Sequence, residues 1–244
     1  MLEFQATSLK TFNNTKKTYT LSFILNIETA TKNCSVSIAK NGETIICREI
    51  AEEGYSHAEK LHVFIEEVIA EAGVAVEDLV AVAVSQGPGS YTGLRIGVSA
   101  AKGLCFALNI PLIAVDTLQT LASQAKVSEG KIIPMLDARR MEVYSEIFSA
   151  DLKIERAIQA EIITENSFKE YTETVYFVGD CAEKCKTVLT LPNFVFLEEI
   201  KYPSAAAMSK ISFDKYQKSD TVDVAYFEPY YLKDFMMAPP SKKA

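Results

Sequence analysis

Hydrophobic and polar positions alternate in three short runs near the beginning of the chain. The runs cover 23–30, 34–40 and 43–51, and Asn41-Gly42 between the last two is a strong signal for a two-residue hairpin turn. Alternation with a period of two is typical of half-buried β-strands. The pattern therefore predicts an antiparallel meander of three strands.

The pattern then changes to the period of a helix over residues 56–72. Ser56, followed three residues later by Glu59, forms a capping box at the beginning of this segment. The apolar side chains share one wide face of the predicted helix. These residues are Ala58, Leu61, Phe64, Ile65, Val68, Ile69 and Ala72.

An apolar run at 79–85 leads through Gly87-Pro88-Gly89 into a second helical pattern at 91–108. This order predicts a strand, a tight turn and a helix. The glycine-rich turn could cradle an anion at the helix N-terminus, but it lacks both the Lys-Ser/Thr ending of a P-loop and the glycine spacing of a dinucleotide fingerprint. The loop alone therefore leaves the chemistry open.

The predicted helix at 91–108 is apolar on nearly all sides. One apolar face is made mainly of small residues, which allow a second helix to approach closely, and a buried helix in the core explains the same pattern. Both interpretations remain open. The small face has Ile96, Ala100, Gly103 and Ala107, the polar strip has Arg95, Ser99 and Lys102, and Phe106 lies beside the strip.

From Pro111 onward, predicted strands alternate with predicted helices. Such alternation in both halves of the chain predicts an α/β fold of two lobes, with a boundary near 109–111. The predicted elements are a strand at 111–116, a helix at 117–126 capped by Asp116, two strands on either side of 137–140, a helix from Ser167, a strand at 175–180, a helix from Cys181, a strand at 197–200 and a helix at 204–213.

The amino-acid composition narrows the range of functions that this chain could have. The 244-residue chain has a net charge of −7, which disfavours direct binding to a phosphate backbone. No run approaches the ~18 apolar residues of a membrane span. Five cysteines without framework spacing favour a reducing, cytoplasmic environment. We expect residues 1–20 to be a disordered leader and residues 236–244 to be a disordered tail.

Two histidines and two cysteines raise the question of a metal site. His57 and His62 lie ~140° apart around a predicted helix, so they cannot chelate one ion. Cys181 and Cys185 have no second pair to complete four ligands, so they fit buried structural thiols. We expect no metal site. Asp137, beside two arginines, fits a structural ion pair at least as well as a binding site.

Six sequence blocks resemble the TsaB (YeaZ) family, in the family's order. The block SQGPGSYTGLRIGVSAAKGL at 85–104 is highly specific. The resemblance implies a two-lobed fold of the actin, sugar kinase and Hsp70 (ASKHA) type, with a first lobe at 21–110 and a reduced second lobe at 111–235. The other blocks are ILNIETAT at 24–31, SHAEKL at 56–61, IPLIAVDTL at 110–118, DARRMEVY at 137–144 and the closing EPYYLKD.

The resemblance also implies a function in forming threonylcarbamoyladenosine (t6A), the modified base at position 37 of tRNAs reading ANN codons. TsaB proteins are noncatalytic paralogues of the transferase TsaD, bind it through first-lobe helices and assemble with the ATPase TsaE. The tRNA would be held only through this complex, and the same helices could form a homodimer. The expected partner-binding residues are Leu61, Phe64, Val68, Arg95, Ile96, Ser99, Ala100, Lys102, Gly103, Phe106 and Ala107.

The phosphate-binding loop of the superfamily is incomplete in this sequence. Such loops combine an acidic residue with nearby glycines and hydroxyls, so that backbone amides face the phosphate. Glu28 and Thr29 keep the acid and the hydroxyl, but no glycine follows until Gly42. We interpret Glu28, Thr29, Gly87 and Gly89 as a vestigial nucleotide loop. No tightly bound cofactor is expected, with ATP or ADP on the partner proteins or bound only weakly here.

The metal site of the transferase is also missing from the sequence. Its H-x-x-x-H pair aligns with Thr117 and Leu121, and neither side chain can replace an imidazole ligand. We therefore expect this chain not to be an enzyme. Two enzymatic alternatives stay open. An ASKHA-type small-molecule kinase could use Glu28 or Asp137 as its carboxylate, and a peptidase-like enzyme would need distant residues to converge in space.

Overall fold

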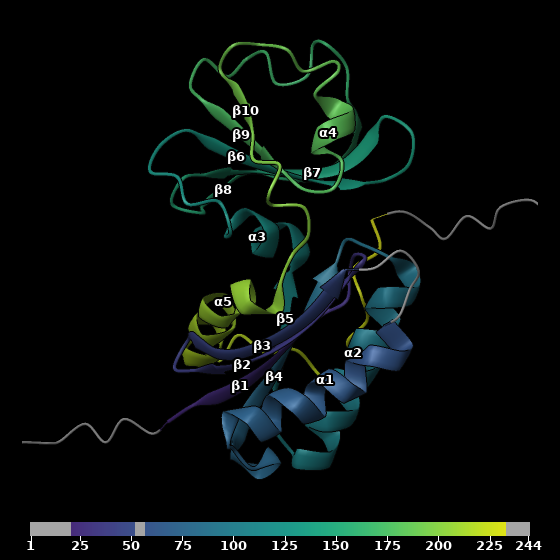
Figure 1. The fold of residues 1–244 in the computed structure, drawn as a ribbon, viewed down its shortest axis with the longest axis vertical. Helices are drawn as coiled ribbons and strands as arrows, with labels where there is room; N and C mark the ends of the chain where they lie inside the picture. Colours follow the sequence, from purple (N-terminus) through teal and green to yellow (C-terminus); the bar gives the residue numbers. More distant parts are fainter. Residues whose placement is uncertain (1–20, 52–56, 233–244) are drawn as a thin grey trace, which may run out of the picture.

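The computed structural model describes residues 21–51 and 57–232. These residues form two lobes at opposite ends of the long axis, each built on a five-stranded sheet (Figure 1). Within them, no helix combines the length and the apolar character that a bilayer span needs. The expected leader, the expected capping residue Ser56 and the expected tail lie outside the described residues.

The first sheet joins the expected antiparallel meander to two parallel strands. Asn41 and Gly42 form the turn within the meander, and their φ angles of 52° and 87° are the positive values that a type I′ turn needs. The strands are β1 (Phe23–Glu28), β2 (Asn33–Lys40), β3 (Glu43–Ala51), β4 (Leu79–Gly87) and β5 (Leu112–Asp116). Their order is β3-β2-β1-β4-β5, with β1 antiparallel to β2 and parallel to β4.

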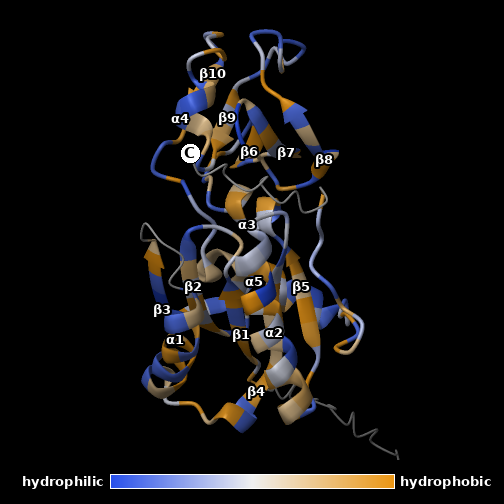
Figure 2. Ribbon diagram, turned by 90° about the vertical axis from the view of Figure 1, so that its right-hand side faces the viewer, coloured by the Kyte–Doolittle hydropathy of each residue, from blue (hydrophilic) through white to orange (hydrophobic). Residues whose placement is uncertain are grey.

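Helices cover both faces of the first sheet. One face carries α1 (His57–Ala72) and α2 (Tyr91–Leu108), and the other carries α5 (Ala205–Gln217). The parallel strands β4 and β5 are therefore covered on both faces, and both are rich in apolar residues, as their colouring shows (Figure 2). The helix predicted at 91–108 is confirmed, with the Ser90 hydroxyl capping its first turn.

The second sheet carries the smaller lobe. The strands expected on either side of 137–140 are confirmed as an antiparallel pair. The strands are β6 (Lys131–Asp137), β7 (Glu142–Ser149), β8 (Ile154–Ile162), β9 (Val175–Val178) and β10 (Phe194–Phe196), in the order β10-β9-β6-β7-β8. Asp137 forms an ion pair with Lys184 of the short helix α4 (Ala182–Cys185), so the carboxylate has a structural partner.

Two elements expected in the second lobe are wrong. The helix expected from Ser167 is a series of turns, because Phe168 adopts a left-handed φ of 63° and buries its ring in the core. The strand expected at 197–200 lies earlier, at β10. Two phenylalanines of β10 pack against Phe177, which places that segment at the sheet edge.

The expected boundary between the lobes is also wrong. Strand β5 pairs with β4, so residues 112–116 belong to the first sheet. A parallel crossover such as β4–α2–β5 returns the chain to the sheet it left. After the second lobe, α5 packs on β1 and β2, and Val222 bridges to Leu112. The second lobe is therefore an insertion built on β6 to β10. The helix α3 (Thr117–Ala122) lies between the two sheets (Figure 1).

Candidate partner-binding surface

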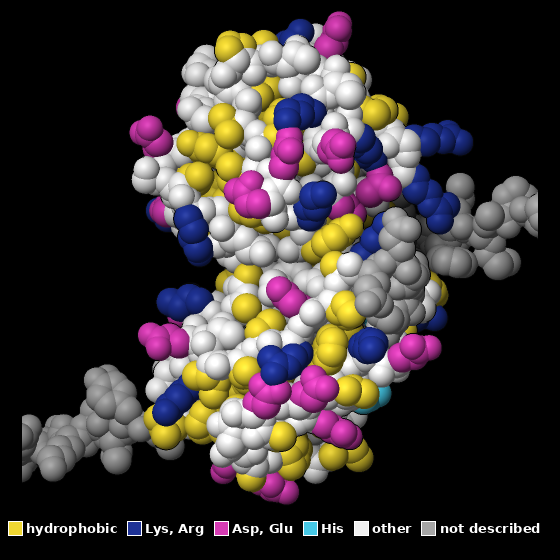
Figure 3. Space-filling view, viewed as in Figure 1, with side chains coloured by type: hydrophobic (Ala, Val, Ile, Leu, Met, Phe, Trp, Pro, Cys, Tyr) yellow, Lys and Arg dark blue, Asp and Glu magenta, His cyan; other side chains and the backbone are white. Residues whose placement is uncertain are grey.

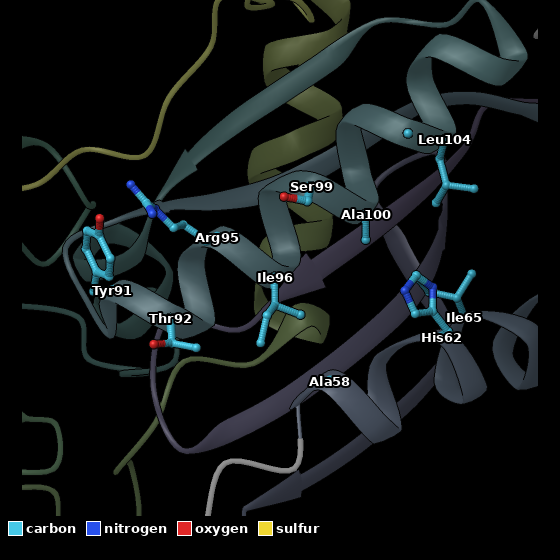
Figure 4. A pocket seen from close by; sticks show the side chains of 11 residues that line it. Ala58, His62, Ile65, Tyr91, Thr92, Arg95, Ile96, Ser99, Ala100 and Leu104 are labelled. Carbon is cyan, nitrogen blue, oxygen red and sulfur yellow. The ribbon is translucent and has the colours of Figure 1, made fainter.

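A groove of about 830 Å3 lies between α1 and α2 (Figure 4). Its floor is mainly apolar, and it stays open at Gly103, where an added Cβ would meet no atom within 4 Å. An apolar groove between two helices is a surface to which another protein can dock. The lining residues are Ala58, His62 and Ile65 of α1, and Tyr91, Thr92, Arg95, Ile96, Ser99, Ala100, Gly103 and Leu104 of α2.

Most of the α2 residues expected to bind a partner lie at this groove or beside it. Phe106 is 85% exposed and Ala107 is also exposed, on the continuation of the same helix. Lys102 is the exception, because its ammonium donates hydrogen bonds to the C-terminal part of the chain. The expected residues that line the groove itself are Arg95, Ile96, Ser99, Ala100 and Gly103.

For two residues of α1, the expectation that they bind a partner is wrong. Leu61 and Val68 are fully buried between α1 and the sheet, so a partner cannot contact them. Phe64 is half-buried against the same core. The widest apolar face of a surface helix is the face that packs on its own domain. The three α1 residues that line the groove are spaced four and three residues apart along one edge of this helix, and two of them, Ala58 and Ile65, belong to the same wide apolar face.

The C-terminal segment 222–232, which we call the strap, packs along α2. The backbone N–H of Tyr230 donates to a carbonyl oxygen of β4 at 2.7 Å. The Nζ of Lys102 donates to the carbonyl oxygens of Ala225 and Phe227, both at 3.0 Å. The strap therefore fixes the side of α2 that borders the groove.

Arg95 lies where the strap meets the groove. Its Nε donates to the hydroxyl of Tyr231 at 3.2 Å, and its guanidinium carbon lies 4.1 Å from the ring centroid of Tyr91. The rings of Tyr91 and Tyr231 are 5.0 Å apart. The hydrogen bond that Arg95 donates to Tyr231 raises the pKa of Arg95 above its usual value. Figure 4 shows Tyr91 and Arg95 side by side at one end of the groove.

The glycine-rich turn before α2 packs directly on the loop after β1. A Cβ on Gly89 would lie 2.3 Å from the oxygen of Ala30, and one on Gly93 would lie 2.1 Å from the oxygen of Thr29. The N–H of Ser90 donates to the Ala30 oxygen at 2.7 Å, and the Thr29 hydroxyl donates to the Gly93 oxygen at 2.8 Å. The glycines therefore permit two backbone segments to touch, and these polar groups are satisfied within the chain.

Asp116 influences two buried glutamates, Glu28 at the end of β1 and Glu146 of β7. Glu28 is fully buried, its Oε1 accepts a hydrogen bond from the N–H of Ala30 at 2.6 Å, and its Oε2 has no partner among the described residues. Burial raises the pKa of Glu28 to about 7, and Asp116 adds repulsion. Burial likewise raises the pKa of Glu146 to about 7, again with repulsion from Asp116. Both glutamates are therefore partly protonated at neutral pH.

Comparison with known proteins identifies the family. The family model described as TsaD, tRNA N6-adenosine threonylcarbamoyltransferase, matches residues 49–227. Over 221 residues the chain is 29% identical to the Escherichia coli (strain K12) tRNA threonylcarbamoyladenosine biosynthesis protein TsaB, covering 86% of this chain and 94% of that protein. The structure of YeaZ from Pseudomonas aeruginosa superposes with a TM-score of 0.75 at 25% identity, covering 86% and 100% of the two chains. The chain belongs to the TsaB (YeaZ) family.

This TsaB-family chain is also related to the transferase. Over 129 residues it is 34% identical to the Bacillus subtilis (strain 168) tRNA N6-adenosine threonylcarbamoyltransferase. The aligned residues cover 47% of this chain and 37% of that enzyme. The two-lobed α/β fold agrees with the fold class that the sequence predicts. The family membership therefore connects the chain with t6A biosynthesis.

Thr117 and Leu121, where the resemblance to TsaD implies that a histidine pair is missing, have packing contacts in this chain. Thr117 and Leu121 are both fully buried. The Thr117 hydroxyl accepts a hydrogen bond from the N–H of Gly87 at 3.2 Å. Gly87 has a φ of 114°, and a Cβ there would lie 2.5 Å from the carbonyl oxygen of Tyr230. Gly87 is therefore enclosed by α3 on one side and by the strap on the other.

The two histidines and the two paired cysteines lie in different surroundings. His57 is buried, and burial lowers its pKa. His62 is exposed on the wall of the groove. Cys181 and Cys185 are buried free thiols in the core of the second lobe. Among the described residues, no group of three or more metal-ligating side chains is placed to hold an ion.

Proposed function

We propose that this chain is a noncatalytic scaffold subunit required for t6A formation at position 37 of tRNAs reading ANN codons. It binds the transferase TsaD through the groove between α1 and α2, and it acts with the ATPase TsaE in the cytoplasm. The tRNA is held by the complex and not by this chain alone. The observation that carries the proposal is the open apolar groove on α2.

The family relationship supports TsaD as the occupant of the groove. The TsaD family model matches 49–227, a range that contains both α1 and α2. Two proteins that share a lobe can pair through equivalent surfaces, as subunits do in an isologous dimer. The small residues Ala100 and Gly103 permit a partner helix to approach closely. A second copy of this chain would use the same surface, so a homodimer would compete with TsaD.

The packing of the loops supports the noncatalytic part of the proposal. Backbone contacts fill the space between Thr29 and Gly93, where a phosphate would need exposed amides. Glu28 is partly protonated at neutral pH, so it is a weak partner for a nucleotide-bound cation. Nucleotide binding by this chain alone is therefore proposed to be weak, with ATP or ADP bound by the partner proteins.

Replacing Gly103 by glutamate tests the groove. The new side chain would project into open space, so the fold should persist while a charge blocks the groove. Gly103→Glu should abolish comigration with TsaD in size-exclusion chromatography and abolish t6A formation in a reconstituted reaction. The matched control is Ala70→Glu, an exposed position of α1 that does not line the groove.

Two results would contradict the proposal. Binding of TsaD by Gly103→Glu with wild-type affinity would place the interface on another surface. Formation of t6A by this chain with threonylcarbamoyl-adenylate and tRNA, without TsaD, would show that the chain is itself the transferase.

A further inference from the structure

The groove has one permanently charged side chain among its lining residues, Arg95. The 18 residues of α2 include no acid, and the other cation of the helix, Lys102, is occupied by carbonyl oxygens of the strap. Within the described residues, no carboxylate forms an ion pair with Arg95. The wall of the groove therefore presents a cation that has no direct ion pair, although Glu228 of the strap lies near enough to interact with it electrostatically.

The guanidinium of Arg95 is oriented before any partner binds. Tyr231 accepts a hydrogen bond from Nε, and Tyr91 covers one face of the guanidinium plane. The strap holds Tyr231 close to Tyr91 through their ring contact. A side chain that is already ordered loses less conformational entropy on binding than a free arginine would.

We propose that Arg95 binds a carboxylate side chain of the docking partner end-on, and that Tyr91 and Tyr231 are positioning residues for this contact. Nε is engaged by Tyr231, so Nη1 and Nη2 remain as a parallel pair of donors that matches the two oxygens of a carboxylate. This inference rests on the proposed function, because the carboxylate belongs to a protein seated in the groove.

The surroundings of Arg95 favour a protein carboxylate over a nucleic-acid phosphate. Ile96, Ala100 and Leu104 beside it make an apolar wall that suits a helix and not a sugar-phosphate chain. The chain has a net charge of −7, which repels a polyanion at longer range. The partner therefore presents an aspartate or glutamate flanked by apolar residues. Glu59 and Glu66 of α1 add to the repulsion, whereas Glu67 and Glu71 are paired with Arg48.

Affinity for purified TsaD of the same organism, measured by biolayer interferometry, tests the contact. Arg95→Glu should weaken binding by at least about tenfold. Arg95→Lys should lose part of the affinity because an ammonium cannot form the planar fork. Tyr231→Phe keeps the ring but removes the acceptor for Nε, so it should weaken binding by a smaller factor with an unchanged unfolding midpoint. The charge-reversal control is Lys153→Glu, an exposed residue of the second lobe.

A charge-reversal scan of TsaD identifies the other side of the contact. One Asp→Lys or Glu→Lys variant on the TsaD helices that correspond to α1 and α2 should restore binding to Arg95→Glu. If Arg95→Glu does not fold, Arg95→Gln replaces it and should lose affinity in the same direction.

Three results separate the inference from the proposed function. Wild-type binding without any effect of Arg95→Glu would overturn the carboxylate contact and leave the scaffold role standing. Weakened binding that no Asp→Lys or Glu→Lys variant of TsaD restores, and that a short RNA competes away, would assign Arg95 to a phosphate and also overturn the inference. No binding of TsaD by the wild-type chain would remove the proposed function and the inference together.

Discussion

Glu28 keeps the residue type of a phosphate-binding loop, but burial changes its charge. Its pKa is raised from 4.5 to about 7, chiefly by burial, while the N–H of Ala30 opposes the shift. The folded-state pKa lies above that of the unfolded chain, so the protonated carboxyl stabilises the fold. This contribution, about 3 kcal/mol, is fully present below about pH 4.5 and is lost as the pH rises through about 7.

Glu28→Gln should flatten the dependence of stability on pH. The amide cannot ionise, and its oxygen can still accept the hydrogen bond from the N–H of Ala30. Between about pH 4.5 and about pH 7.5, the free energy of unfolding of the variant should fall by about 3 kcal/mol less than that of the wild type. Urea unfolding followed by circular dichroism over this range measures the difference.

The control for this prediction is Glu77→Gln, at an exposed carboxylate. That variant should follow the wild-type pH profile. Glu146 titrates in the same region, and it is present in all three proteins, so comparison with the wild type isolates Glu28. An unchanged pH profile for Glu28→Gln would show that Glu28 is already ionised in the folded protein at acidic pH.

The helix α2 uses its glycines in two opposite ways. At Gly97, a Cβ would lie 2.2 Å from the hydroxyl oxygen of Thr29, so this side of the helix must stay bare to pack on the loop after β1. At Gly103, a Cβ would meet nothing within 4 Å. One helix therefore combines a close internal contact near its beginning with an open external groove near its end.

Alanine substitutions at the two glycines should have opposite effects on the stability of the fold. Gly97→Ala should destabilise the fold by about 1–3 kcal/mol through overpacking against Thr29. Gly103→Ala should stabilise it by about 0.5–1 kcal/mol, because alanine loses less backbone entropy in a helix. Urea unfolding midpoints at fixed pH compare the two variants with the wild type. Equal effects of the two substitutions would show that the loop after β1 yields readily to an added methyl group.

At the scale of the whole molecule, the chain returns to the first lobe after building the second. Helix α5 packs on β1 and β2, and the strap then follows α2 to the edge of the groove. The surface proposed for the partner is thus made by helices from the first half of the chain and is fixed by a segment from its end. On the face that Figure 3 shows, acidic side chains lie on both lobes, interspersed with lysines and arginines.

The isolated chain should bind tRNA poorly. Its net charge of −7 offers few cations to replace the counterions of a phosphate backbone. In an electrophoretic mobility shift assay at about 0.15 M salt, the chain alone should not retard an ANN-decoding tRNA at micromolar concentration. The same tRNA with the reconstituted TsaD and TsaE complex provides the positive control. Retardation by the chain alone would assign a direct tRNA-binding surface to it.

Local signals in the sequence were sufficient where neighbouring residues decide the structure. Asn41-Gly42 predicted the hairpin turn, and Asp116 predicted the cap of α3, whose carboxylate accepts from the N–H of Gln119 at 2.8 Å. These local signals failed where a contact between residues far apart in the chain decides the structure. The turns around Phe168 follow from the burial of its ring, and the wide apolar face of α1 did not reveal that Leu61 and Val68 pack on the sheet while its edge borders the groove.

The sequence by itself determined the family, the two-lobed α/β class and the boundaries of α2, because these depend on residue identity, periodicity and caps along a continuous segment. Only the tertiary structure decided that β5 belongs to the first sheet, that Leu61 is core and that the strap orients Arg95. The physical reason is that sheet pairing, burial and side-chain contacts join residues far apart in the chain. A local sequence pattern does not show which distant segment will contact a given residue.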